Sequence, residues 1–360
     1  MTPRRTRLLM VLTVTLTLLA GLAASEWVLR WQRDRIQASD RIDPGMILYD
    51  PLLGWRLKPH WQGEHRHHDF HVRYHINGQG FRGRQGPVPR EALAVLGDSF
   101  TFGLGVDEGA TFIDRLDQHR GPTLNLGIPG YSTDQQLLLL ESVERRLPRH
   151  VLLVVYLGND LADNLLDYPL QADQAKPRFV LEDGRLRLRN TPVPQRPKPA
   201  AARRQTLASL ILGPDAGPAH PLGRLEIARR LGLFQPRSNL DEARLQQRLR
   251  PALDLFHALA TKMQQRLQHS QRRFAVALLA GRRFVEAPAS PSARYQDHLR
   301  RRLIDELPRR GIPVIDLALP LRQQGGADLY HPNEGHLNPQ GHRRIADILA
   351  DELDALGWTP

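Results

Sequence analysis

The fold is indicated first by a short apolar run that leads into a serine-containing turn, ALAVLGDSFTFG at residues 92–103. The apolar run is typical of a buried strand that ends at Gly97. A serine at a strand-to-helix turn lies at the carboxyl edge of the sheet, where open α/β folds bind ligands. The backbone N–H of Ser99 would also lie at a helix start, where partial positive charge favours an oxyanion. Taken alone, the segment is also compatible with an ordinary serine helix cap.

Strands and helices alternate on the C-terminal side of this turn. The patterns predict strands at residues 124–126, 151–157, 274–279 and 313–317, and helices at 111–119, 133–147, 241–268 and 294–307. The strand at 151–157 is apolar throughout, as in a strand buried on both faces. Asn338 and Pro339 suit the cap and first turn of a last helix. We therefore expect an α/β fold, a three-layer α/β/α sandwich with a mostly parallel central sheet.

Composition excludes several classes of protein. Of the 360 residues, 41% are hydrophobic, which excludes a wholly disordered chain. No cysteine is present, so disulfides, cysteine nucleophiles, iron–sulfur clusters and cysteine-based zinc sites are excluded. The net charge is +12, but only four of the 50 basic residues are lysines, as coding bias towards arginine would produce. No nucleic-acid-binding motif accompanies the charge, so we expect no nucleic-acid partner.

The N-terminus, residues 1–35, is predicted to be a signal anchor. Three arginines at positions 4, 5 and 7 precede an uncharged run, residues 8–25, long enough at about 27 Å to cross a bilayer. The alternative is a cleavable signal peptide, because residues 21–25 are mostly small. The leading arginines favour a cytoplasmic N-terminus, although Arg30, Arg33 and Arg35 on the far flank oppose this orientation. We expect a single-pass protein of the cell inner membrane with its catalytic domain on the periplasmic side.

Two further segments flank or interrupt the alternating pattern. Residues 36–90, the lead-in, contain a predicted half-buried strand at His67–Ile76 and a packed hairpin, with no catalytic role. Histidines four apart on a strand lie about 13 Å from each other, too far to share a metal ion. Residues 169–237, the basic insertion, hold ten prolines and 13 basic against five acidic residues. With a hairpin predicted at Asp183-Gly184, the insertion is either a lid or substrate wall or a solvated loop.

Three more polar motifs lie at the ends of predicted strands or before the last helix. They are Asn125–Gly130, Gly158-Asn159-Asp160 and Glu334–His342, and the topology brings them to the edge of the sheet that holds Ser99. In this order the four motifs resemble those of the SGNH (GDSL-type) hydrolase family. The resemblance covers a domain at residues 91–358, interrupted by the basic insertion. The lead-in resembles that of membrane-anchored bacterial members.

The resemblance implies roles for five residues. Ser99 would be the nucleophile and His336 the general base, with no metal or cofactor. Ser99, Gly130 and Asn159 would form the oxyanion hole, with Gly127 as a less favoured substitute for Gly130. The family's usual acid stands three residues before the histidine, where this chain has Asn333. Some extracytoplasmic, polysaccharide-modifying relatives place the acid two residues before the histidine, and Glu334 stands there in this chain. The alternatives are Asp328 or a dyad without an acid. His342 is expected at the surface.

The chemistry that follows is acyl transfer through Ser99. We expect an extracytoplasmic serine esterase that acts on acyl, foremost acetyl, esters of an envelope or exported polysaccharide. One alternative is a polysaccharide O-acetyltransferase that uses the same serine. Since a single membrane segment cannot import an acyl donor, that enzyme would need a multi-spanning acyltransferase partner. Another alternative is a catalytically silent envelope scaffold or glycan-binding module.

Overall fold

A computed structural model describes residues 3–212, 221–231, 233 and 242–358, and at its centre is a five-stranded parallel sheet. The strand order is β12-β11-β8-β6-β7. The strands are β6 (Leu93–Gly97), β7 (Thr123–Gly127), β8 (His150–Tyr156), β11 (Arg273–Leu279) and β12 (Val314–Asp316). The first six residues of the middle strand β8 are buried, as its continuous apolar sequence predicts.

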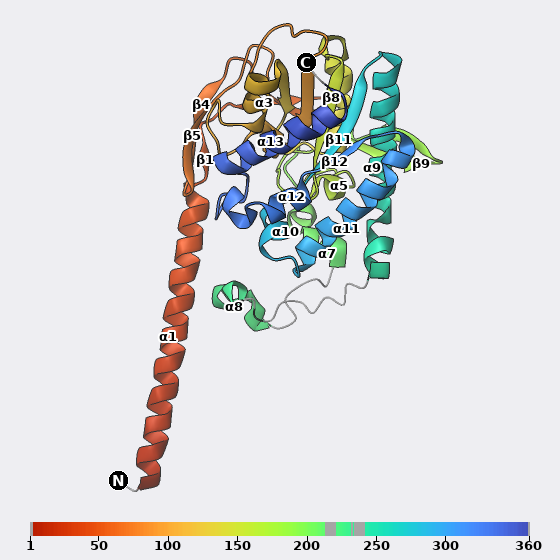
Figure 1. The fold of residues 1–360 in the computed structure, drawn as a ribbon. Helices are drawn as coiled ribbons and strands as arrows, with labels where there is room; N and C mark the ends of the chain where they lie inside the picture. The colour runs from red at the N-terminus through yellow and green to blue at the C-terminus, as the bar shows by residue number, and fades with distance from the viewer. Residues whose placement is uncertain (1–2, 213–220, 232, 234–241, 359–360) are drawn as a thin grey trace.

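Helices cover both faces of this sheet, which confirms the predicted three-layer α/β/α fold (Figure 1). One layer holds α3 (Phe112–Arg120) and α13 (Pro339–Ala355), which pack against each other. The other holds α4 (Thr133–Val143), α9 (Glu242–His269) and α11 (Pro291–Glu306). Asp241, predicted to begin the long helix α9, lies outside the described residues. Short helices complete the domain at α2 (Ser99–Phe102), α5 (Asp160–Asp163), α10 (Arg282–Glu286) and α12 (Ala318–Gln323).

The lead-in folds into two small antiparallel sheets instead of extending the central sheet. Its strands are β1 (Arg41–Ile42), β2 (Ile47–Asp50), β3 (Gly54–Leu57), β4 (Gln62–His67) and β5 (Phe70–His75). The prediction of one strand from His67 to Ile76 was wrong at its start. His67 pairs with Phe70 across a two-residue turn, so the alternating pattern of β5 begins only after the chain reverses.

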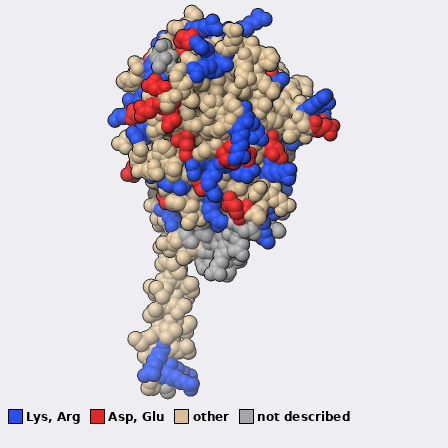
Figure 2. Space-filling view, turned by 45° about the vertical axis from the view of Figure 1, so that its right-hand side comes forward, with Lys and Arg blue, Asp and Glu red and all other residues tan. Residues whose placement is uncertain are grey.

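The N-terminal helix α1 (Pro3–Ser39) projects away from the body of the protein (Figure 1). It is long and apolar enough to cross a membrane, as an anchor or as a signal sequence, and no residue of it is buried. Figure 2 shows basic side chains at its free tip and, between the tip and the body, a stretch without charged side chains, which corresponds to residues 8–25. The helix continues four residues beyond the boundary predicted at residue 35.

The basic insertion contains the predicted hairpin, β9 (Arg178–Glu182) and β10 (Arg185–Arg189), which is followed by short helices. The turn residues Asp183 and Gly184 have φ values of 49° and 72°, as a two-residue hairpin requires. The helices are α6 (Ala200–Arg203), α7 (Leu207–Leu212) and α8 (Glu226–Arg230). Residues 213–220, 232 and 234–237 of the insertion lie outside the described residues.

Candidate active site

Ser99 is the first residue of α2, directly after β6 and the turn residue Asp98. The Asp98 carboxylate accepts the Phe100 N–H at 2.9 Å and so caps the helix. Close packing explains the glycines around this turn. A side chain at Gly97 would meet Thr101 Oγ1 at 2.1 Å, and one at Gly127 would meet the Phe102 nitrogen at 2.4 Å. The serine is thereby held rigidly at the carboxyl edge of the sheet, as the strand-to-turn pattern predicted.

A chain of hydrogen bonds joins Ser99 to His336 and Glu334. Ser99 Oγ lies 2.7 Å from His336 Nε2, and His336 Nδ1 lies 2.6 Å from Glu334 Oε1. The second Glu334 oxygen accepts the His336 backbone N–H at 2.9 Å. Because the carboxylate holds the proton on Nδ1, Nε2 is left to accept the Ser99 hydroxyl proton. Within the described residues, no hydrogen bond or ion pair joins the Asp328 carboxylate to His336, whose carboxylate partner is Glu334.

The groups around His336 favour its protonated form more than water does. Burial opposes the charge on His336, but the carboxylates around it, Glu334 foremost and then Asp98 and Asp40, together raise the pKa of His336 above its ordinary value of 6.5. Burial likewise opposes the charge on Glu334, yet His336 lowers the pKa of Glu334. Asp98 is more deeply buried, and its pKa rises to about 6. The three groups therefore form a site in which an imidazolium is stabilised.

The pH dependence of catalysis should report this arrangement. Only neutral His336 accepts a proton, so we expect kcat/KM to fall as the pH drops through a value above 6.5. Glu334→Gln removes the main group that raises the pKa, so its acid limb should move to lower pH while its rate at high pH is also reduced. Rate profiles from pH 4.5 to 9 measure both effects. An unchanged acid limb in the variant would contradict the assigned pairing.

Asp69, in the turn between β4 and β5, fixes the loop that carries Glu334. Its Oδ2 accepts the backbone N–H groups of Asn333 and Glu334 at 2.7 and 2.9 Å, and its Oδ1 accepts Asn333 Nδ2 at 2.6 Å. Sequence reasoning missed this residue, because the lead-in was assigned no part in the site. The partners are 264 and 265 residues apart in the chain, and no local pattern reports such a contact.

Asp69→Ala should therefore lower kcat more than it raises KM. The loop would lose three hydrogen bonds, and misplacement of a reacting group by about 1 Å costs on the order of 10²-fold in rate. Asp69→Asn keeps one acceptor oxygen and should retain more activity. Steady-state kinetics on p-nitrophenyl acetate, with thermal unfolding as a check of folding, measures both variants. Equal kcat in Asp69→Ala and the parent would exclude this positioning role.

Asn159 and Asp163 form a second polar pair beside the first. Asn159 follows β8, and its Nδ2 donates to Asp163 Oδ2 at 2.5 Å. The other Asp163 oxygen accepts the backbone N–H of Leu170, at the start of the basic insertion, at 2.8 Å. Burial raises the pKa of Asp163 to about 6. Since an amide nitrogen carries two protons, Asn159 retains one donor for a ligand.

The two glycines considered for the oxyanion hole are placed differently. The Gly127 N–H donates to Asn125 Oδ1 at 2.9 Å and is therefore occupied. Gly130 lies in the loop after β7 with a φ of 80°, and this loop adjoins the Ser99 turn through the bond from Ile128 N–H to the Gly97 oxygen at 3.2 Å. Within the described residues, the Gly130 N–H has no hydrogen-bond acceptor. Gly130 thus keeps a backbone donor that Gly127 lacks.

A cleft of about 880 Å³ is lined by three of these residues, Asn159, Glu334 and His336. Its floor includes Phe100, whose ring lies 4.4 Å from both His336 and Tyr156, measured between ring centroids. Its walls come from the α10 and Asn333–Gly335 segments and from the basic insertion. The insertion contributes Leu170, Gln171, Leu207 and Arg230. Of the two interpretations of the insertion, a substrate wall agrees with these contacts.

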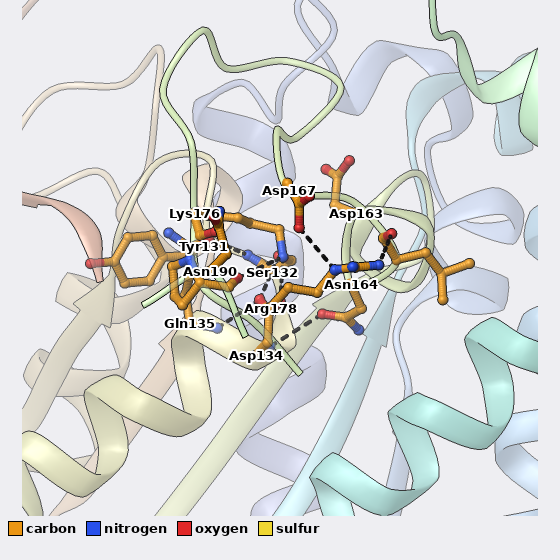
Figure 3. A network of polar contacts seen from close by, with 12 residues as sticks. Tyr131, Ser132, Asp134, Gln135, Asp163, Asn164, Asp167, Lys176, Arg178 and Asn190 are labelled. Carbon is orange, nitrogen blue, oxygen red and sulfur yellow. Dashed lines mark hydrogen bonds and ion pairs between the residues drawn. The ribbon is translucent and has the colours of Figure 1, made fainter. Parts of the chain in front are cut away.

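A buried network holds the beginning of the insertion against the sheet edge (Figure 3). Lys176 and Asp134 form an ion pair in which neither side chain is exposed. Asp134 also accepts Ser132 Oγ–H at 2.9 Å and the Gln135 N–H at 2.8 Å, and Asn190 Nδ2 donates to the Lys176 carbonyl at 2.7 Å. The network joins the start of α4 to the insertion close to Asp163 and Asn164, which are drawn beside it.

His342 was wrongly predicted to lie at the surface. It is 1% exposed and accepts the Phe112 N–H on its Nδ1 at 3.1 Å, with its ring stacked on that of Phe112. Burial lowers the pKa of His342 well below its ordinary value. This histidine joins α13 to α3. Its position on α13 alone did not show which face the helix buries.

The chain is similar to one protein family and to several solved structures. The model of the GDSL-like lipase/acylhydrolase family matches residues 95–344. A lipolytic G-D-S-L protein from Veillonella parvula is 13% identical, with a TM-score of 0.38, over 72% of this chain and 96% of that one. A lipase/acylhydrolase from Enterococcus faecalis is 14% identical, with a TM-score of 0.39, over 73% and 95%. No curated protein matches the chain.

The family match spans more than half of the chain and includes all four polar motifs. It also contains Ser99, Asn159, Glu334 and His336, the residues that the fold gathers at one edge of the sheet. The chain therefore belongs to the GDSL-like lipase/acylhydrolase family and is an ester-hydrolysing enzyme.

Proposed function

We propose that the protein is a membrane-anchored, extracytoplasmic serine esterase with Ser99 as nucleophile. The observation that carries this proposal is the unbroken hydrogen-bond chain from Ser99 through His336 to Glu334, the last two of which line a cleft. A serine hydroxyl is a weak nucleophile until an adjacent base takes its proton. His336 supplies that base, and Glu334 orients the ring and stabilises the imidazolium.

The reaction proceeds in two acyl-transfer steps. Ser99 Oγ attacks the ester carbonyl while its proton passes to His336 Nε2, and the tetrahedral intermediate forms. Collapse of the intermediate breaks the ester C–O bond, and His336 returns the proton to the leaving alcohol. Water then attacks the acyl-Ser99 ester by the same route and releases the acid and free Ser99.

The oxyanion is held by the backbone N–H groups of Ser99 and Gly130 and by Asn159 Nδ2. Each donor of this kind is worth about 10²–10³-fold in rate. Asp163 supports the arrangement, because it accepts one of the two protons of Asn159 Nδ2 and so orients the amide. The second proton is then available to the oxyanion. The bond of Asp163 to Leu170 couples the same donor to the wall of the cleft.

The substrate class is inferred from the cleft and the anchor. The cleft is lined by three arginines, Arg230, Arg282 and Arg283, and by two carboxylates, Glu286 and Glu334. Within the described part of the chain Arg283 has no ion-pair partner. This excess of positive charge favours an anionic ester. With α1 as an anchor and the leading arginines in the cytoplasm, an acetylated, anionic polysaccharide of the envelope or in export fits the site.

Acetate release tests both parts of this proposal. The full chain in detergent is given p-nitrophenyl acetate, an acetylated polyuronate and an acetylated neutral xylan. We expect kcat/KM for the polyuronate to exceed that for the xylan by about tenfold at low salt and to lose that advantage at high salt. Arg283→Glu should reduce the difference in kcat/KM between the two polysaccharides.

The possible results separate the alternatives. Equal rates on the two polysaccharides would refute the anionic class but leave the esterase in place. Acetyl transfer to an added sugar in preference to water would identify an O-acetyltransferase. A folded protein that is inactive on every ester would favour the alternative of a scaffold or glycan-binding module.

A further inference from the structure

Helix α8 of the basic insertion is attached to the N-terminal helix. The backbone N–H groups of Glu226 and Ile227 donate to the two carboxylate oxygens of Glu26 at 2.9 and 3.1 Å. Arg33, two turns further along α1, forms an ion pair with Glu226 at 3.3 Å. Figure 1 shows α8 beside α1 and below the body of the domain. The insertion is thus connected to the anchor at one defined position along α1.

That position coincides with the end of the uncharged segment. Glu26 is the first charged residue after the run at residues 8–25, so α1 would leave the hydrocarbon core at this position. From Glu26 to Ser39, 13 residues further on, the helix rises by about 20 Å at 1.5 Å per residue. Helix α8 therefore occupies the space between the body of the domain and the surface of the membrane.

The side chains around α8 are of the kind found at a lipid surface. Leu231 and Leu233, just after the helix, are 66% and 49% exposed. Arg33, Arg229 and Arg230 lie 3.3–3.9 Å from Glu226. Arg33 also pairs with Asp34, and Arg30 with Glu26, so four arginines face three carboxylates and the cluster has one positive charge in excess. Exposed leucines beside arginines are typical of segments that lie in the interface of an anionic bilayer.

The same segment contributes to the cleft. Arg230 lines it together with Phe100, Asn159 and His336. A segment that contacts both lipid and cleft would hold the cleft at the membrane surface and direct its open side there. On the basis of the proposed membrane-anchored esterase, we propose that residues 221–231 and Leu233 rest on the headgroups of an anionic bilayer, so that the ester reaches Ser99 along the membrane surface.

The absence of native cysteine makes this contact directly measurable. Single cysteines at Leu231 and Leu233 of the full chain are labelled with the fluorophore NBD. The protein is reconstituted into phosphatidylcholine vesicles with or without 30% phosphatidylglycerol and with headgroup or acyl-chain spin-labelled lipid as quencher. Leu16, in the uncharged run of α1, is the positive control. Leu188, in β10 of the same insertion and 37% exposed, is the matched negative control.

We expect headgroup-level quenching at positions 231 and 233 in the anionic vesicles, deep quenching at 16 and none at 188. Glu26→Ala should reduce the quenching at 231 to the level at 188, because it removes both hydrogen bonds to α8. Equal melting temperatures of the labelled variants show that they are folded.

Two results would overturn the inference in different ways. If the probe at position 16 is quenched but the probes at 231 and 233 are quenched no more than the probe at 188, the surface contact alone is refuted and the anchored esterase stands. No quenching at 16 refutes the anchor, and with it the part of the proposed function on which the inference rests.

Discussion

Ser99→Ala is expected to lower kcat for p-nitrophenyl acetate by on the order of 10⁴–10⁶-fold, because the acyl group then has no nucleophile to which it can transfer. KM should change little, since Ser99 is small and the cleft walls come from other segments. Steady-state assays of the full chain in detergent measure both parameters. The residual rate reports the oxyanion donors, which remain in the variant.

The matched variant is His336→Ala, alone and combined with Ser99→Ala. Residues that act as one unit are strongly non-additive, so the double variant should be no slower than Ser99→Ala alone. A loss of less than about tenfold in Ser99→Ala, with correct folding, would contradict the assignment of Ser99 as nucleophile.

Lys176→Met is expected to destabilise the protein by about 3–5 kcal/mol, because it leaves the Asp134 carboxylate buried without its counter-charge. Neither side chain of the pair is exposed. Burial raises the pKa of Asp134 and Lys176 lowers it, so the loss of Lys176 should raise the pKa of this carboxyl further in the folded state. Urea unfolding of the full chain in detergent, followed by tryptophan fluorescence, measures the free energy of unfolding.

Two controls distinguish the effect of an uncompensated buried charge on stability from the effect of losing any basic side chain. Asp134→Asn combined with Lys176→Met should recover most of the lost stability, since no uncompensated charge remains. Arg189→Met removes an exposed partner of Glu182 in the same insertion and should cost less than about 1 kcal/mol. If Lys176→Met were as mild as Arg189→Met, the insertion would not depend on this pair.

The layered fold was predictable because its signals are local. The apolar runs of β6, β8 and β11 and the cap formed by Asn338 lie within a few residues of the structure they specify. The strand predicted from His67 failed for a related reason. A pattern of period two continues unchanged across a two-residue turn, so it does not show where the chain reverses.

The polar motifs of the site were also predictable, but the contacts that support them were not. Ser99, Asn159 and His336 each stand beside a strand or helix end, and parallel strands bring such ends together. Asp69 and Lys176 act through partners that only the tertiary structure brings near them. His342 is buried because α13 packs on α3, which depends on how the whole layer is assembled.

The central claim, that Ser99 is an activated nucleophile, is tested most directly by a covalent probe. The full chain is treated with a fluorophosphonate, digested and analysed by mass spectrometry. The account predicts one phosphonylated peptide, modified at Ser99, and labelling that is strongly slowed in His336→Ala. A folded protein that is not labelled, or one labelled at another serine while Ser99 stays unmodified, would contradict it.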